Sequence, residues 1–174
     1  GENNTALGYR ALQNFTTGHS NVAIGQNAGD AITTAVANIA IGALAAGALT
    51  TGGDNIAIGY AALQAADGAE DSNIVIGSGA GMSINNDASD DNVFIGTYAG
   101  KGGTGVLASN VAIGHLAMDG TGTVAGQQNI FIGLNAGGGT WTTAVSNYNV
   151  GIGANSMASA LNSATYNTAL GYFA

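Results

Sequence analysis

The feature that most constrains this chain is a short phrase that recurs along its whole length. The pattern Asn-x-x-Ile/Leu-Gly starts at Asn4, Asn21, Asn38, Asn55, Asn73, Asn92, Asn110, Asn129, Asn149 and Asn167. The steps between these ten copies are 17 to 20 residues, and three residues past each Gly comes Ala, with Ser156 the one exception. A fixed internal period of about this length is typical of repeat architectures. Residues 1–174 are therefore predicted to form a single repeat array.

Each copy is predicted to contain a short β-strand. In NVAIG, residues 21–25, the β-branched and small residues alternate, and this is the period of an extended strand rather than of a helix. A helix would not keep Val and Ile at period two with Gly closing every copy. The Gly at the end of the phrase, as in Gly25, Gly42 and Gly59, is expected to permit a positive φ or a close approach of backbone.

Strands with one shared pattern stack best in parallel, so the predicted fold is all-β: a parallel β-solenoid, or β-roll, of about ten coils. At about 4.8 Å per coil the rod would be on the order of 45–50 Å long. We expect Ile24, Ile41 and Ile58 to stack on one another in a narrow core. Asn21, Asn38 and Asn55 are expected to form an amide ladder along an edge, as in cross-β stacks.

Two familiar solenoids do not fit the sequence. A hexapeptide helix needs an aliphatic residue every six positions, but six residues after Ile58 comes Gln64. The calcium-binding nonapeptide GGxGxDxUx is absent as well. The remaining solution is a coil with two short faces and a loop that varies in length and content.

Composition excludes several classes of partner. Only 7% of residues are charged, the formal net charge is −8, and Arg10 and Lys101 are the only fixed cations. Nucleic acid is not expected as a partner, because no basic patch exists to displace counterions from phosphates. No apolar run approaches the ~20 residues of a membrane helix, so membrane insertion is not expected. The chain has no Cys, which removes disulfides and thiolate metal sites.

The phrase also carries a resemblance. NNTALGYRALQNFTTGHSNVAIG, residues 3–25, resembles the Asn-Thr-Ala-φ-Gly-Tyr-x-Ala-Leu…Thr-Thr-Gly repeats of phage tail fibres and related bacterial surface proteins. NVAIG is also similar to the Ser-Val-Ala-Ile-Gly core of trimeric autotransporter adhesin heads, which are left-handed parallel β-rolls assembled as homotrimers. The resemblance implies an extracellular protein, on a virion tail fibre or a bacterial cell surface, that acts as a homotrimer.

A trimer is also expected from the residues. The side of each strand opposite Ile is small, mostly Ala or Gly, and another chain could approach it closely. Phe94 and Phe131 interrupt that small side, and we expect them to be trimer contacts near a three-fold axis. The alternative is that the small side packs against the chain's own second face. Neither end carries a polar capping repeat, so we expect a segment of a longer chain or a unit that stacks end to end.

No catalytic constellation is expected. His19 and His115 lie far apart in the array and at different offsets within their coils, without a paired Asp or Cys. Asp87, Asp90 and Asp91 form a weak candidate calcium loop, since calcium prefers oxygen-rich loops; a solvated acidic loop is the simpler interpretation. No cofactor is expected. Trp141, Tyr148 and Tyr166 in the late coils could stack on sugar rings or anchor loops.

The expected function is therefore that of a non-enzymatic structural and adhesive rod. It would display loops for attachment to a host-surface glycan or protein receptor, with many weak contacts adding into avidity. The alternative is a self-assembling extracellular filament whose subunits stack end to end. A depolymerase would need a pair of carboxylates in a groove, and the acidic residues are scattered among loops.

Overall fold

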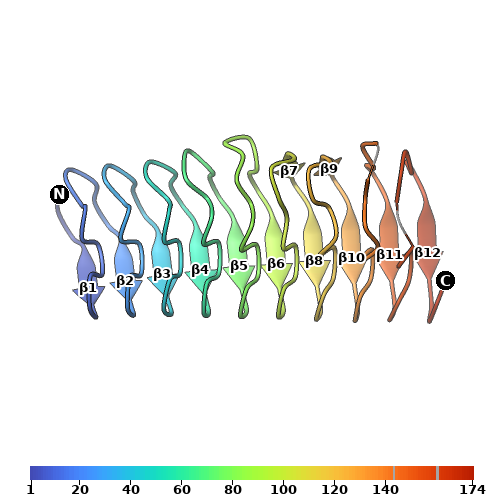
Figure 1. The fold of residues 1–174 in the computed structure, drawn as a ribbon, viewed down its shortest axis with the longest axis horizontal. Coiled ribbons are helices and arrows are strands. Elements are labelled where there is room, and N and C mark those ends of the chain that lie inside the picture. The colour runs from blue at the N-terminus through green and yellow to red at the C-terminus, as the bar shows by residue number, and fades with distance from the viewer. Residues whose placement is uncertain (143, 160) are drawn as a thin grey trace.

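The structure, a computed structural model that describes residues 1–142, 144–159 and 161–174, is a parallel β-solenoid. Figure 1 shows the coils stacked side by side, with the two termini at opposite ends of the rod. The strands are β1 (Thr5–Leu7), β2 (Val22–Ile24), β3 (Ile39–Ile41), β4 (Ile56–Ile58), β5 (Ile74–Ile76), β6 (Val93–Ile95), β7 (Leu107–Ala108), β8 (Val111–Ile113), β9 (Gly126–Gln127), β10 (Ile130–Ile132), β11 (Val150–Ile152) and β12 (Thr168–Leu170).

Ten of these strands form one parallel sheet in chain order. β7 and β9 pair as a second, two-stranded sheet among the variable loops that precede the strands, hereafter the loop side. The register is strict: Val22 pairs with Ile39, and Ile24 with Ile41, so each phrase lies directly over the next. The predicted fold class, a parallel β-solenoid built on the recurring phrase, is confirmed. Ten strands about 4.8 Å apart make a sheet about 43 Å long.

The asparagine ladder is present and lies inside the coil. Asn38 Oδ1 accepts hydrogen bonds from the backbone N (3.0 Å) and Nδ2 (3.1 Å) of Asn55. Asn38 Nδ2 in turn donates to Asn21 Oδ1 (3.1 Å) and across the coil to the Gly52 carbonyl (2.8 Å). Asn21, Asn38 and Asn55 are at most 1% exposed, so the ladder is a buried corner and not the edge expected from sequence. Each amide ties its own coil together and joins it to both neighbours.

The glycine that ends each phrase is required by both conformation and space. Its φ lies between 128° and 138° in all ten copies, a region that side chains disfavour. A Cβ built on Gly42 would lie 2.4 Å from the carbonyl oxygen of Gly59 in the next coil. The stacked backbones therefore approach too closely for any other residue, as the sequence predicted.

The expected core was wrong in one respect: the two sides of the strand are exchanged. The central residue of each strand, such as Ala23, points inward and is fully buried. Its neighbours, including Ile24, Ile41 and Ile58, point outward and are only half-buried. The physical reason is the thinness of the coil: the small central residue leaves space for larger core side chains from the other layer, such as Leu63 and Met118.

Phe94 and Phe131 are therefore not exposed trimer contacts, and that expectation is wrong. Both are central strand residues with 0% exposure, so the alternative packing against the chain's own second face holds. Space for each ring comes from a glycine in the same coil. A Cβ on Gly100 would lie 2.3 Å from the Phe94 ring, and one on Gly137 would lie 2.6 Å from the Phe131 ring.

The same exchange of volume recurs in other coils. Where the central residue is Ala57 or Ala112, the buried position six residues later carries the larger Leu63 or Met118. Where the central residue is Phe, that position is Gly. In these coils a large residue at one of the two positions is matched by a small one at the other, as close packing requires.

The turns between strand and loop use left-handed backbone in every coil. The residue before each Asn and the second residue after each Gly have φ near +55° to +65° throughout, including bulky Leu44 and Tyr98. This backbone conformation is unfavourable for most residues, so the hydrogen bonds between stacked coils must hold them there.

The described part of the chain contains no helix that is long and apolar enough to span a membrane.

Candidate functional site

The largest candidate surface is the outward side of the ten-stranded sheet, hereafter the outer face. It consists of the first and third residue of each strand: Thr5, Leu7, Val22, Ile24, Ile39, Ile41, Ile56, Ile58, Ile74, Ile76, Val93, Ile95, Val111, Ile113, Ile130, Ile132, Val150, Ile152, Thr168 and Leu170. None of these is charged, and all are half-buried or exposed. Because neighbouring strands are in register, as Figure 1 shows, these residues follow one another in two straight columns along the rod, apolar except for Thr5 and Thr168.

The size of the outer face matters. Ten strands of three residues cover a footprint on the order of 400 Å². The largest apolar patch on a typical soluble monomer is about 300–600 Å² and is often functional, so the outer face has the size of such a patch. Ile130 is 37% exposed and Ile152 is 36% exposed, although Ile is among the residue types most often fully buried. The outer face is therefore a candidate interaction surface.

Two further columns border the outer face. The entry flank is the residue just before each repeat Asn, and the exit flank is the first two residues after each repeat Gly. The entry flank carries two carboxylates, Asp54 beside β4 and Asp91 beside β6, and both are exposed. At the same two levels the exit flank carries Tyr60 and Tyr98, which are 60% and 40% exposed.

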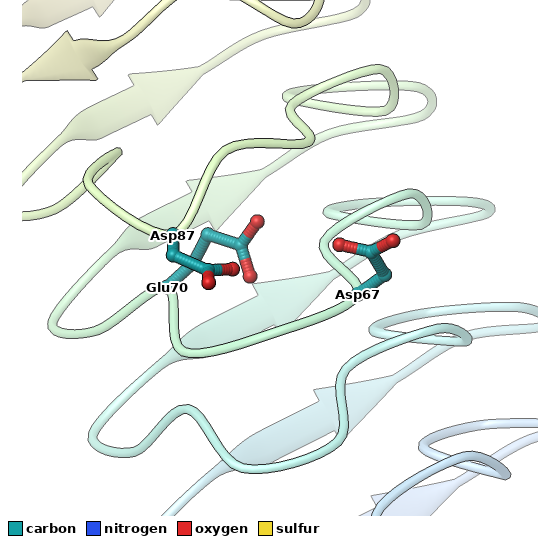
Figure 2. A group of neighbouring side chains, drawn as sticks. All are labelled: Asp67, Glu70 and Asp87. Carbon is teal, nitrogen blue, oxygen red and sulfur yellow. The ribbon is translucent and has the colours of Figure 1, made fainter.

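On the loop side, three carboxylates from two consecutive coils come together, as Figure 2 shows. Asp67, Glu70 and Asp87 each offer one oxygen, and these oxygens lie within 4.8 Å of one another. Asp67 and Asp87 are exposed, whereas Glu70 is fully buried. Such a set could supply three of the six to eight oxygen ligands that calcium takes.

The oxygens of this cluster already have structural roles. Glu70 Oε2 accepts a hydrogen bond from Gly68 N, and its Oε1 accepts one from Asn86 N, both at 3.1 Å. Burial raises the pKa of Glu70, and the nearby charge of Asp87 adds to that rise. Glu70 thus links two coils through their backbone amides. Its buried acceptor role accounts for its position without a metal ion.

The calcium loop expected from sequence is divided in the structure. Asp87 joins Asp67 and Glu70, while Asp90 Oδ1 accepts a hydrogen bond from Asp71 N at 2.8 Å. Asp91 lies on the entry flank. Burial is the main cause that raises the pKa of Asp90, with smaller contributions from the charges of Asp71, Asp91 and Asp87. Sequence reasoning missed Asp67 as a member of the cluster.

The aromatic residues Trp141, Tyr148 and Tyr166 lie in two different environments. Trp141 is 2% exposed and packs edge-on against Phe131, with ring centroids 6.3 Å apart. It is a core anchor and not a sugar platform. Tyr148 and Tyr166 are exposed and stack on each other in adjacent coils, with centroids 4.8 Å apart and an interplanar angle of 1°.

Asp119 is the remaining carboxylate with a perturbed pKa. Burial raises that pKa, while the charges of Lys101 and His115 oppose the rise. Its Oδ1 is buried without a hydrogen-bond partner among the described residues, as is the hydroxyl of Ser156. His19 lies far from Asp119, near the other end of the rod, where its Nδ1 is 3.3 Å from Ser20 Oγ.

Comparison of the chain with protein-family models, curated proteins and solved structures gave no match.

Proposed function

We propose that this chain is a non-enzymatic structural and adhesive rod that works as a homo-oligomer, with three copies packed through their outer faces. The single observation that carries the proposal is the outer face itself: an uncharged, straight and half-exposed array of Val and Ile on a stiff solenoid. Closed rotational symmetry is the usual form of soluble homo-oligomers. Three copies around an axis parallel to the rod would bury all three outer faces together.

The adhesive part of the proposal rests on the loop side. The strands stay in strict register while the coils between them vary from 17 to 20 residues, so the added residues accumulate in the loops at the edge of the sheet where the strands begin (Figure 1). Loops displayed at fixed spacing on several copies would add weak contacts into avidity. The resemblance of residues 3–25 to phage tail-fibre and surface-adhesin repeats supports an extracellular setting, with a glycan or protein on a host surface as receptor.

The assembly is tested by a triple variant, Ile41→Thr/Ile58→Thr/Ile76→Thr, with Ile41→Val/Ile58→Val/Ile76→Val as matched control. Both keep β-branched residues on the outer face, but the first places a hydroxyl at each site, whereas the second stays apolar and loses one methylene per site. Sedimentation equilibrium should give an oligomer for the wild type and the Val control, and a folded monomer for the Thr variant. A mass that rises without limit with concentration would favour the end-to-end filament instead.

The adhesive role needs a separate test. The labelled wild type is compared with a variant whose loop 83–91 is replaced by the shorter loop 48–54, on a glycan array and a panel of bacterial cells. Saturable binding that depends on the longer loop is the expected result. Absence of binding by the oligomeric wild type to every member of the panel would contradict adhesion and leave only a structural rod.

A further inference from the structure

The outer face by itself does not fix how two copies align along the rod, if the proposed self-association is correct. Strands β3, β4 and β5 all place Ile at both outward positions. A slip of one coil, about 4.8 Å, would therefore replace Ile by Ile over much of the face. Repetitive flat surfaces are prone to such slippage. A device that specifies register must lie outside the outer face.

The two flanks provide the variation that the outer face lacks. The entry flank carries carboxylates at only two levels, Asp54 beside β4 and Asp91 beside β6. At these levels the exit flank carries Tyr60 and Tyr98. All four side chains reach solvent. In the part of the chain that the structure describes, no side-chain hydrogen bond uses the carboxylates of Asp54 and Asp91 or the two hydroxyls.

Symmetry determines which flanks meet. A rotation about an axis parallel to the rod brings the entry flank of one copy beside the exit flank of its neighbour, at the same level. This holds for a dimer and a trimer alike. An antiparallel pair would instead bring two exit flanks together. Tyrosine therefore faces aspartate at both levels only when the copies are parallel and in register.

We propose that the Tyr60 and Tyr98 hydroxyls of one copy donate hydrogen bonds to Asp54 and Asp91 of the neighbouring copy, and that these pairs fix a parallel, in-register assembly. This inference rests on the proposed function. A slip of one coil places Tyr60 opposite Ala37 or Ser72, and neither carries a charge. A hydrogen bond from a hydroxyl to a carboxylate is shorter and stronger than one between two neutral groups.

The two pairs are not equivalent. A Cβ built on Gly79 would lie 2.4 Å from Cε1 of Tyr98, so the Tyr98 ring lies directly over the coil that precedes its own. Bringing its hydroxyl to the level of Asp91 requires a change of rotamer. The pair of Tyr60 with Asp54 is therefore the main register contact.

The affinity test uses Tyr60→Phe and Asp54→Asn in the full chain, with Tyr9→Phe as matched control. Tyr9 has the same place on the exit flank, but the entry flank at its level carries Asn3. Sedimentation equilibrium should show association about tenfold weaker in each test variant, no further loss in the double variant, and no change in Tyr9→Phe. Equal effects of Tyr9→Phe and Tyr60→Phe, or no effect of either, would overturn the register contact.

The register itself is read by cross-linking, because the chain has no Cys of its own. A short bismaleimide should join copies of Asp54→Cys/Tyr60→Cys into closed covalent oligomers. It should join copies of Ala37→Cys/Tyr60→Cys, one coil out of register, much less. Equal yields from both would overturn the register inference while the oligomer stands. A monomeric wild type would instead contradict the proposed function from which the inference starts.

Discussion

The inward-pointing and the outward-pointing residues of each strand meet different packing requirements. In β10, Phe131 points inward, is fully buried and is matched by a glycine six residues later in the same coil. Ile132, the next residue, points outward and is only half-buried although it is purely apolar. The inner column is fixed by volume, coil by coil, whereas the outer column repeats one shape along the rod. A solenoid can thus place its larger aliphatic residues on the outside when a partner covers them.

The largest test of this comparison is made in β10. Phe131→Ala should cost about 4 kcal/mol of unfolding free energy, because it leaves a cavity. The outward control Ile132→Ala should cost less than half of that, because the side chain is already partly exposed. Chemical denaturation at several protein concentrations separates folding from association. Equal costs would contradict the assignment of inside and outside.

The exchange of volume between the two core positions predicts a second substitution that restores the stability lost in Phe131→Ala. Gly137→Met in the Phe131→Ala background recreates the pairing seen at Ala112 and Met118. The double variant should recover a substantial part of the lost stability. Gly137→Met alone should destabilise, since its side chain meets the Phe131 ring. Additive losses in the double variant would show that the two layers do not share one volume.

The ladder inside the coil comes next in size. Asn38→Ala should cost about 3 kcal/mol, because it leaves the Asn55 amide and the Gly52 carbonyl buried without their partner. Asn167→Ala is the control, since this ladder member is exposed and, among the described residues, its Nδ2 donates to Asn149 Oδ1 and Thr165 O alone. Urea unfolding of the two variants measures the difference. A loss at Asn38 no larger than the loss at Asn167 would count against a structural ladder.

A gain of stability is expected at Ser156, which stands where every other copy has Ala three residues after the repeat Gly. Ser156 is fully buried and its hydroxyl has no partner among the described residues. Ser156→Ala should raise the unfolding free energy by about 1 kcal/mol, as it removes an unsatisfied polar group. Thermal unfolding of Ser156→Ala and of Ser163→Ala, an exposed control, checks this. A loss of stability would point to an unseen partner for the hydroxyl.

The smallest expected effect is a pH dependence of the unfolding free energy that arises from Glu70 on the loop side. Burial raises the folded-state pKa of Glu70 above its unfolded value, so the folded chain binds this proton more tightly. Stability contributed by protonation is therefore present at low pH and is lost as pH rises through the folded pKa. The wild type should gain stability relative to Glu70→Gln as pH falls from neutrality toward 4.5, the ordinary value. A difference that stays constant with pH would contradict this linkage.

Much of the fold could be predicted from the sequence, because stacked copies need the same residue at the same place. The amides of Asn21 and Asn38 and the close approach at Gly42 followed from the period alone. Alternation defines two sides of a strand but not which side is inner, and the assignment of Ile24 to the core was wrong for that reason. The size exchange between Phe94 and Gly100 was the available signal.

The loop side could be predicted less well, because coils of unequal length shift the offsets there. Asp87 is close in sequence to Asp90 and Asp91, and this closeness suggested the wrong grouping. The stacking of adjacent coils brings Asp87 to Glu70 and Asp67 instead. No pattern in the sequence gives the orientation of a loop side chain relative to the coil before it.

The central claim is that the outer face is covered by further copies of the chain. The most direct test is the mass of the wild-type chain in solution, measured by light scattering across a range of concentrations. The account predicts a constant mass of three times the 16.9 kDa chain. A well-folded species of 16.9 kDa at every concentration would contradict it.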